Sequence, residues 1–194
     1  MQYRELLWIF TQLPDNYVVL DTETTGLPDK NGLPDIVTLG LAIVEERNVA
    51  NSLEFKVKPN KSISKEAQSV HGITDQQAEA FKPLKSQWQE ISSILNGRLV
   101  VIHNASFDWP ILLNQATQNS LEMPGISGIF CSQKAAFPWA QSMQLECSSR
   151  GPSLDTLTSA LEVEDLRAKE NGLHGARIDA VQTAQLVEAI RRKA

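Results

Sequence analysis

Acidic side chains interrupt an apolar strand near the start of the chain. Asp21 and Glu23 follow three apolar residues in the run YVVLDTE, which begins at Tyr17. In a strand, residues i and i+2 project from the same face, so the two carboxylates would lie roughly 7 Å apart. Carboxylates in a half-buried strand cost free energy unless they are paired or bound to a metal. The same residues could equally be the end of the strand reaching water, and this feature alone does not separate the two interpretations.

Two more carboxylates and a histidine occur in comparable positions. Asp108 follows the apolar run Leu99–Ile102 and opens a helix, where an acidic residue also complements the helix dipole. Asp179 lies at the start of the last helix, five residues after His174. That spacing is about 140° around a helix, so the histidine, which is flanked by glycines, is expected on a loop instead. Taken alone, such a histidine is more often an ordinary surface or core residue.

Together, the four carboxylates and the histidine indicate a hydrolytic metal site. Four converging carboxylates would repel one another and raise one another's pKa values. With two divalent cations they form the oxygen-rich site that Mg²⁺ or Mn²⁺ prefers. A pair of such ions can activate water and stabilise the leaving oxygen of a phosphodiester. His174 would then be the general base, because imidazoles titrate near neutral pH.

Short apolar runs predict the strands that position these residues. The expected strands are Tyr17–Glu23, Ile36–Glu46, Ser52–Lys58, Leu99–Ile102 and Ile126–Phe130. The first three are joined by short connections, which predicts an antiparallel meander.

Helices are expected between and after the later strands. They are an amphipathic opening helix, a turn capped by Thr74 and Gln77, a helix with Leu84, Trp88, Ile91 and Leu95 on one face, a helix opened by Ser106 with Pro110 in its first turn, a helix capped by Ser153, and a closing helix over 176–191. A meander followed by strands that alternate with helices predicts an α/β fold with a mixed sheet flanked by helices.

Length and composition limit the classes of protein that fit. The 194 residues suit a single domain over 1–194, with a core from about 17 to 190. The net charge of −5 excludes a generic polybasic nucleic-acid binder, but not an enzyme that reaches phosphates through metal ions. Cys131 and Cys147 lack the spacing of a disulfide scaffold or zinc ribbon and suggest reduced thiols. The apolar patch Leu6–Phe10 is too short to span a membrane, so a cytoplasmic protein is expected.

Three segments of the sequence resemble the exonuclease motifs of the DEDDh 3′→5′ exonucleases. They are DTETTGL at Asp21–Leu27, HNASFD at His103–Asp108 and HGARIDA at His174–Ala180, and VHGIT at Val70–Thr74 resembles a further segment of the group. The match runs from about 17 to 190 and is closest to the proofreading (epsilon) subunits of bacterial DNA polymerase III and their stand-alone relatives. The resemblance implies a ribonuclease H-like fold, with a five-stranded mixed sheet and helices on both sides.

The resemblance also implies roles for individual residues. The metal ligands would be Asp21, Glu23, Asp108 and Asp179, and the general base would be His174. The backbone around Thr24 would contact the terminal nucleotide and its 3′-OH, while Leu27 and Phe107 would pack against the last bases. The implied activity is metal-dependent removal of nucleoside 5′-monophosphates from single-stranded 3′ ends, of DNA rather than RNA, in replication or repair.

The sequence departs from the family pattern at two places. Cys131–Ser132 stands where relatives often have Asp-Thr, which affects the strand end but no catalytic role. The sequence ends 15 residues after Asp179, so the tail by which proofreading subunits dock on a polymerase is not expected, which favours a stand-alone nuclease.

Two alternative functions stay open. One alternative is an RNA or oligonucleotide 3′-exonuclease. The other is a catalytically idle nucleic-acid-binding or polymerase-accessory module, which would have no need to retain all five catalytic residues.

Other polar and aromatic residues have simpler explanations. Lys56, Lys58, Lys61 and Lys65 form a basic stretch that suits a solvated sheet edge better than a nucleic-acid path. Trp109 could stack on a base or pack in the core, and Arg177 could reach a phosphate or lie on the surface. His71, His103 and Asn104 are expected to support loops.

Overall fold

A five-stranded mixed sheet forms the centre of the molecule. The computed structural model describes residues 3–30, 32–170 and 172–193. The strands are β1 Tyr17–Thr24, β2 Ile36–Glu45, β3 Asn48–Lys56, β4 Leu99–Ile102 and β5 Gly128–Cys131. Their order in the sheet is β3-β2-β1-β4-β5. Strands β1, β2 and β3 pair antiparallel, whereas β4 pairs parallel with β1 and β5. The predicted meander and mixed sheet are therefore confirmed.

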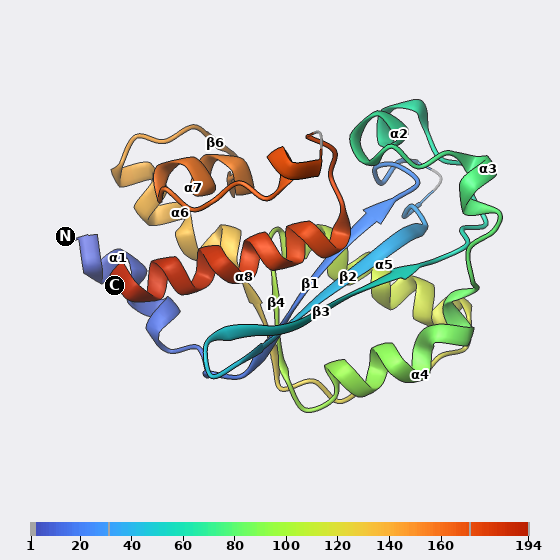
Figure 1. Cartoon of the computed structure of the whole chain (residues 1–194), viewed down its shortest axis with the longest axis horizontal. Coiled ribbons are helices and arrows are strands. Elements are labelled where there is room, and N and C mark those ends of the chain that lie inside the picture. The colour runs from blue at the N-terminus through green and yellow to red at the C-terminus, as the bar shows by residue number, and fades with distance from the viewer. Residues whose placement is uncertain (1–2, 31, 171, 194) are drawn as a thin grey trace.

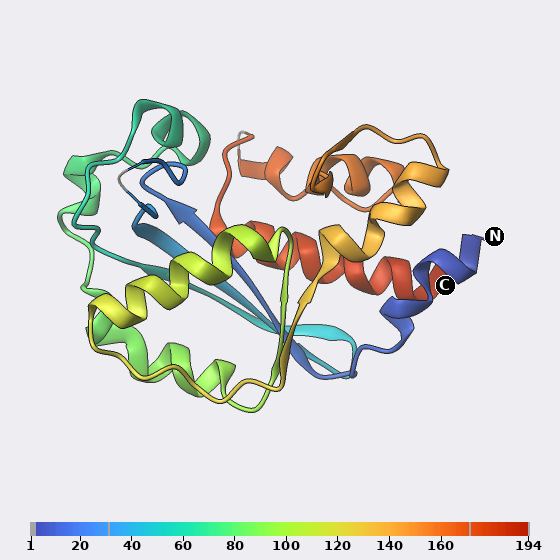
Figure 2. The ribbon, with the colours of Figure 1, turned by 180° about the vertical axis from the view of Figure 1, so that it is seen from behind.

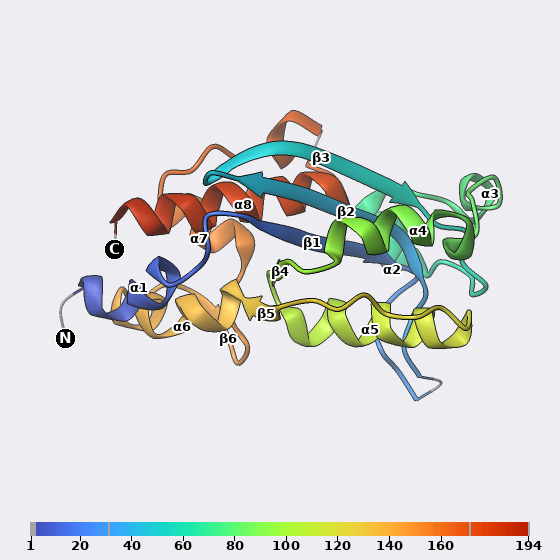
Figure 3. The same cartoon turned by 90° about the horizontal axis from the view of Figure 1, so that it is seen from below.

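Two layers of helix cover the sheet, one on each face (Figures 1 and 2). One face carries α1 Tyr3–Thr11, α6 Ser132–Ser142, α7 Leu154–Ala160 and α8 Ala176–Lys193, and the other carries α4 Leu84–Leu95 and α5 Ala105–Gln118. Alternation along β1 explains both cores, because Tyr17 and Val19 pack on the α8 side while Val18 and Leu20 pack on the α4–α5 side. The side view in Figure 3 shows α8 and α5 on opposite sides of β1.

The hairpin between β2 and β3 shifts one predicted strand. Glu46 and Arg47 both have positive φ, 48° and 66°, as in the tight turns that match the twist of a hairpin. Pairing therefore resumes at Asn48, four residues before the predicted start of this strand, and ends at Lys56 instead of Lys58. The strand lies at the edge of the sheet, as expected for the basic stretch that begins in it.

Short elements crowd one end of the sheet (Figure 1). They include α2 Lys65–His71 and α3 Asp75–Ala78. The capping box of Thr74 and Gln77 is present. Helix α2 was not predicted, because its seven residues are too few for a clear apolar period. Its boundaries come from the Ser64 cap and from Gly72, whose φ of 74° ends it. The remaining elements are the two-residue strands β6 Cys147–Ser148 and β7 Gly151–Pro152 and the 3₁₀ turn η1 Arg167–Glu170.

The start of α5 differs from its prediction. The helix begins at Ala105 after Asn104, whose φ is 70°, so Pro110 lies in the second turn and not in the first. Strand β5 is likewise shifted, to 128–131 from the predicted 126–130. Both cysteines are free thiols. Across the described ranges, no helix is long and apolar enough to cross a membrane.

Candidate active site

A cleft of about 450 Å³ opens beside the carboxyl end of β1. All eight residues that the sequence predicts for the site line it: Asp21, Glu23, Thr24, Leu27, Phe107, Asp108, His174 and Asp179. They come from β1 and the loop after it, from α5, and from the start of α8 with the loop before it. The fold therefore brings together residues that lie up to 158 positions apart in the sequence.

Strand β1 supplies two carboxylates from one face. Asp21 pairs with Gly40 of β2 and Glu23 pairs with Thr38, so both belong to the regular part of the ladder. Their side chains share the face of Tyr17 and Val19, which is the face that α8 covers. They are thus directed toward the helix that carries Asp179. This arrangement favours the functional interpretation of the two acids over a strand that merely ends in water.

Thr22 holds the third carboxylate in place. It lies between the two acids of β1 and points to the opposite face. Its backbone N–H and its hydroxyl both donate to Oδ1 of Asp108, at 3.0 and 2.7 Å. Asp108 is buried, with 3% of its surface exposed, so these two bonds replace water for that oxygen. Sequence reasoning did not single out Thr22, because its partner is 86 residues away.

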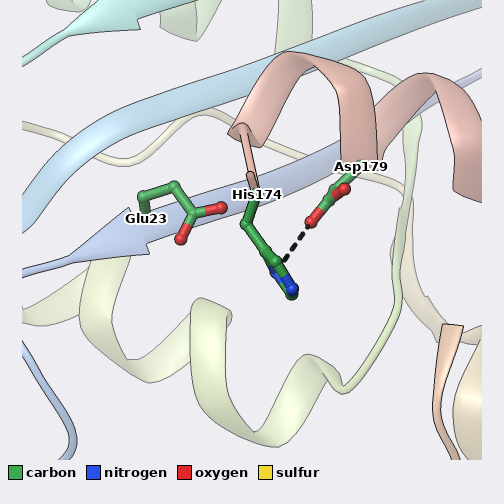
Figure 4. A group of neighbouring side chains, drawn as sticks. All are labelled: Glu23, His174 and Asp179. Atoms are coloured by element: carbon green, nitrogen blue, oxygen red, sulfur yellow. Dashed lines mark ion pairs between the residues drawn. The ribbon is translucent and has the colours of Figure 1, made fainter. Parts of the chain in front are cut away.

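The loop before α8 brings His174 to Asp179. The helix begins at Ala176, so His174 precedes it. The angle between residues five apart in a helix therefore does not keep His174 and Asp179 on different faces. Nδ1 of His174 lies 3.5 Å from Oδ2 of Asp179. The dashed line in Figure 4 marks this pair. Ligand atoms of Glu23, His174 and Asp179 all lie within 4.8 Å of one another, close enough to hold one metal ion. The backbone N–H of His174 donates to the carbonyl of Val70, which ties this loop to α2.

Burial and mutual repulsion change the acidity of the carboxylates. Burial, together with the charges of the other acids, raises the pKa of Asp21 well above its usual range. The same two effects raise the pKa of Glu23 to about 8. Burial raises the pKa of Asp108 to about 7, although the hydrogen bonds from Thr22 act to lower it. Carboxylates whose pKa values are raised this far lack sufficient positive charge around them. A divalent cation would supply that charge.

Asp179 differs from the other three because a cation already contacts it. Burial acts to raise its pKa, but hydrogen bonds from His174 and Arg167 outweigh burial and lower it. The Arg167 guanidinium donates from Nε and Nη2 to the two carboxylate oxygens of Asp179, both at 2.6 Å, and from Nη1 to Asp155. Nothing in the sequence pattern around Arg167 indicates a partner twelve residues later, so its contact with Asp179 could not be predicted.

The two other histidines support loops, as expected. The ring of His71 accepts the N–H of Ile73 at Nδ1, so its proton lies on Nε2, 3.3 Å from the carbonyl of Thr24. Burial lowers the pKa of His71, consistent with a neutral ring. His103 places Nε2 at 3.2 Å from the carbonyl of Pro152 and Nδ1 at 3.0 Å from the hydroxyl of Ser132. Ser132, one of the two residues that depart from the family pattern, thus keeps a hydroxyl at this position, and that hydroxyl fixes a histidine.

The residues expected at the substrate differ in exposure. Leu27 is 79% exposed, and Val70, also on the wall of the cleft, is 42% exposed. Phe107 is partly buried, with contacts to the core on the α4–α5 side, and it also lines the cleft. Trp109 packs against the same core and is absent from the lining, which favours the packing role for it.

Comparisons with known proteins agree with this geometry. The sequence profile of the exonuclease family RNase_T matches residues 18–187. The DNA polymerase III subunit epsilon of Pasteurella multocida is 28% identical over 172 residues, which cover 86% of this chain and 64% of that protein. The chain therefore spans less than two thirds of the length of this relative.

Solved structures share the fold. The structure titled exonuclease X in complex with 5′ overhanging duplex DNA matches with a TM-score of 0.66 at 23% identity, over 92% of each chain. The nuclease domain of 3′hExo, a DEDDh family member bound to rAMP, matches with a TM-score of 0.72 at 14% identity, over 93% of each chain. The ribonuclease H-like fold expected from the sequence is confirmed.

Proposed function

Because this chain belongs to the exonuclease family RNase_T, we propose that it is a metal-dependent 3′→5′ exonuclease that releases nucleoside 5′-monophosphates from single-stranded 3′ ends. One observation carries the proposal. The four carboxylates and His174, which come from three separate parts of the chain, line a single cleft. A nucleic-acid-binding module without activity would gain nothing from gathering four mutually repelling acids, three of them buried, in one cleft.

The donor set fits two divalent cations. Asp21, Glu23, Asp108 and Asp179 would hold them, and hard oxygen ligands of this kind suit Mg²⁺ or Mn²⁺. The raised pKa values of Glu23 and Asp108 support this fit, because they reflect carboxylates that lack a counter-charge. When bound, the two ions would activate the attacking water and stabilise the leaving oxygen.

The chain's own residues would orient the reaction and move its proton. His174 would accept the proton of the attacking water on a ring nitrogen, as a general base does. Asp179, 3.5 Å from Nδ1, would orient the ring and stabilise the imidazolium that forms. Thr22 would keep Asp108 facing the cleft through the two hydrogen bonds to one carboxylate oxygen, which leaves the other oxygen for a ligand.

The terminal nucleotide would bind on the wall beside β1. The backbone of Thr24 would contact the 3′-OH, and His71 would hold that backbone through the Thr24 carbonyl. Leu27 would cover the last base from its exposed position, and Phe107 would stack on a base. These contacts recognise the end of a strand and not its sequence.

DNA is the substrate that we propose first, because the epsilon relative is a subunit of a DNA polymerase and exonuclease X is bound to a DNA duplex with an overhang. RNA is the second candidate, because the 3′hExo domain is bound to rAMP. The two differ at the 2′-OH, which a protein can contact as donor or acceptor.

A digestion assay tests the proposal. Single-stranded DNA, blunt duplex DNA and single-stranded RNA of one sequence, each labelled at the 5′ end, are incubated with Mg²⁺, Mn²⁺ or EDTA. We expect a ladder shortened from the 3′ end, nucleoside 5′-monophosphates as products, and no cleavage in EDTA.

Two variants serve as controls for the assay. Asp21→Ala should be inactive, and Glu90→Ala, which removes an exposed acid on α4, should match the unmodified protein. Binding of single strands without cleavage under any metal would favour the idle module, and cleavage in EDTA would exclude the two-metal mechanism.

A further inference from the structure

Arg167 places a positive charge among the carboxylates of the cleft. Its side chain is 12% exposed, and it lines the cleft together with the four acids. Its fork engages both oxygens of Asp179 at 2.6 Å, in the planar bidentate geometry that guanidinium and carboxylate share. Asp179 is at the same time one of the three residues whose ligand atoms cluster closely enough to hold a metal ion. One carboxylate therefore faces two possible cations.

Full engagement of a carboxylate by arginine competes with coordination of a metal. A divalent cation would bind a lone pair of Asp179 in the plane of the carboxylate. The distance between the metal and the oxygen would be shorter than the donor–acceptor distance of a hydrogen bond. The guanidinium, 2.6 Å from both oxygens, occupies one lone pair of each and places its positive charge beside any ion on the remaining lone pairs. Two cations side by side would also repel each other at short range.

We infer that Arg167 is a positioning residue that competes with a divalent cation for Asp179, so that metal loading requires the guanidinium to leave this carboxylate. The inference rests on the proposed function, because it takes Asp179 as a metal ligand. The competition sets the metal concentration at which the site fills. The charge of Arg167 also offsets the repulsion among the four carboxylates in the folded protein before the metal binds.

Asp155 offers the displaced guanidinium a second partner. It lies in the first turn of α7, its side chain is 71% exposed, and it already accepts a bond from Nη1 of Arg167. The arginine can thus release Asp179 without losing every charged partner. Arg167 begins the 3₁₀ turn of four residues, and the loop that leads from it to α8 carries His174.

Metal-binding measurements test this inference without relying on activity. The binding of Mn²⁺ is measured by electron paramagnetic resonance or calorimetry for the unmodified protein, Arg167→Gln and Arg177→Gln. Arg177 is the matched control, because it is an exposed arginine two residues from Asp179 and its loss removes the same charge near the site. We expect Arg167→Gln to bind Mn²⁺ about tenfold more tightly or better, since it no longer has to break a charge-assisted pair. Arg177→Gln should change the affinity by less than about threefold, as expected for a screened surface charge.

Thermal unfolding separates competition from a purely structural role. In EDTA, Arg167→Gln should melt at a lower temperature than the unmodified protein, because the acids lose their counter-charge. In saturating Mn²⁺ the difference between the two melting temperatures should disappear or change sign, because the metal replaces the arginine. A variant that is less stable in both conditions and binds Mn²⁺ no more tightly would show that Arg167 only braces the loop.

The same measurements keep the two proposals apart. If neither the unmodified protein nor Arg167→Gln binds Mn²⁺, the proposed function fails. If both bind Mn²⁺ with equal affinity, the metal site stands and the competition is wrong. Arg167→Lys, which keeps the charge but loses the fork, should bind Mn²⁺ with an intermediate affinity.

Discussion

Gly40 lies directly beneath Ala176, so that β2 and the first turn of α8 touch through bare backbone. A Cβ atom on Gly40 would lie 2.1 Å from the carbonyl carbon and oxygen of Ala176, far inside ordinary contact. Gly40 is also the residue that pairs with Asp21 across the sheet. The absence of a side chain at this one position therefore sets how closely Asp179 approaches the carboxylates of β1.

A methyl group at Gly40 should impair the site more than the fold. Gly40→Ala must push α8 away from β2, and a shift of about 1 Å in reacting groups can cost about a hundredfold in rate. We expect a loss of that order in kcat/KM, with a decrease of about 1–3 kcal/mol in the free energy of unfolding. Gly125→Ala, whose new methyl would meet only Asn96 at 3.7 Å, is the control. Equal kinetics for both variants would mean that the approach of α8 is not critical.

Mn²⁺ should stabilise the protein through Asp21. A ligand that binds only the native state raises the melting temperature, by about 5–10 °C at roughly a hundredfold excess over its Kd for a chain of this size. Asp21→Ala should lose most of this rise. In EDTA the same variant should be at least as stable as the unmodified protein, because it removes a half-buried carboxylate whose pKa is raised by desolvation and by the charges of its neighbours. Differential scanning calorimetry with and without metal checks both expectations.

Truncation of the substrate wall should weaken binding of the strand end. Leu27→Ala should raise KM on single strands without loss of kcat, because in the proposed function the exposed side chain would contact the bases and not the reacting groups. Phe107→Ala should raise KM about tenfold or more, since stacking on an aromatic ring is worth about 1–3 kcal/mol per base. Leu113→Ala is the control, because Leu113 is 45% exposed on α5 but does not line the cleft. Steady-state kinetics that are unchanged in both wall variants would place end recognition elsewhere.

Loss of the histidine on the loop should affect chemistry and not binding. His174→Ala should lower kcat by about 10²–10⁴-fold, the usual contribution of a general base. The affinity for single strands should stay nearly constant, because the four carboxylates remain. A variant with the original kcat would show that His174 is an ordinary loop residue.

His103 should make folding stability depend on acid pH. Burial lowers the pKa of its ring from about 6.5 in the unfolded chain to about 4 in the folded protein. Between these values the unfolded state binds more protons, so stability is lost as the pH falls from about 6.5 toward 4. The loss attributable to His103 should reach roughly 2–3 kcal/mol. Urea unfolding of the unmodified protein and of His103→Gln across this range measures it, and a difference that does not change with pH would contradict it.

The sequence by itself determined the main layers of the fold and predicted the residues that line the cleft. The two-residue period of a strand places Asp21 and Glu23 on one face, and the runs before Asp108 and Asp179 mark the other acids. The same local patterns predicted the meander and the mixed sheet that the structure contains. These features depend on neighbours in the chain, so the sequence is enough to recognise them. Short elements were harder, and α2 and the position of Pro110 within α5 were missed or misplaced.

Only the tertiary structure decided what surrounds the four acids. Thr22 meets Asp108 across 86 residues, Gly40 meets Ala176 across two layers, and Arg167 folds back onto Asp179 through a loop without periodic pattern. Such contacts follow from how closely whole elements pack, and a side chain's type and spacing carry no information about the distance between two packed surfaces. For that reason the sequence predicts which residues line the cleft, whereas the packing of α8 on the sheet decides how near they come to one another.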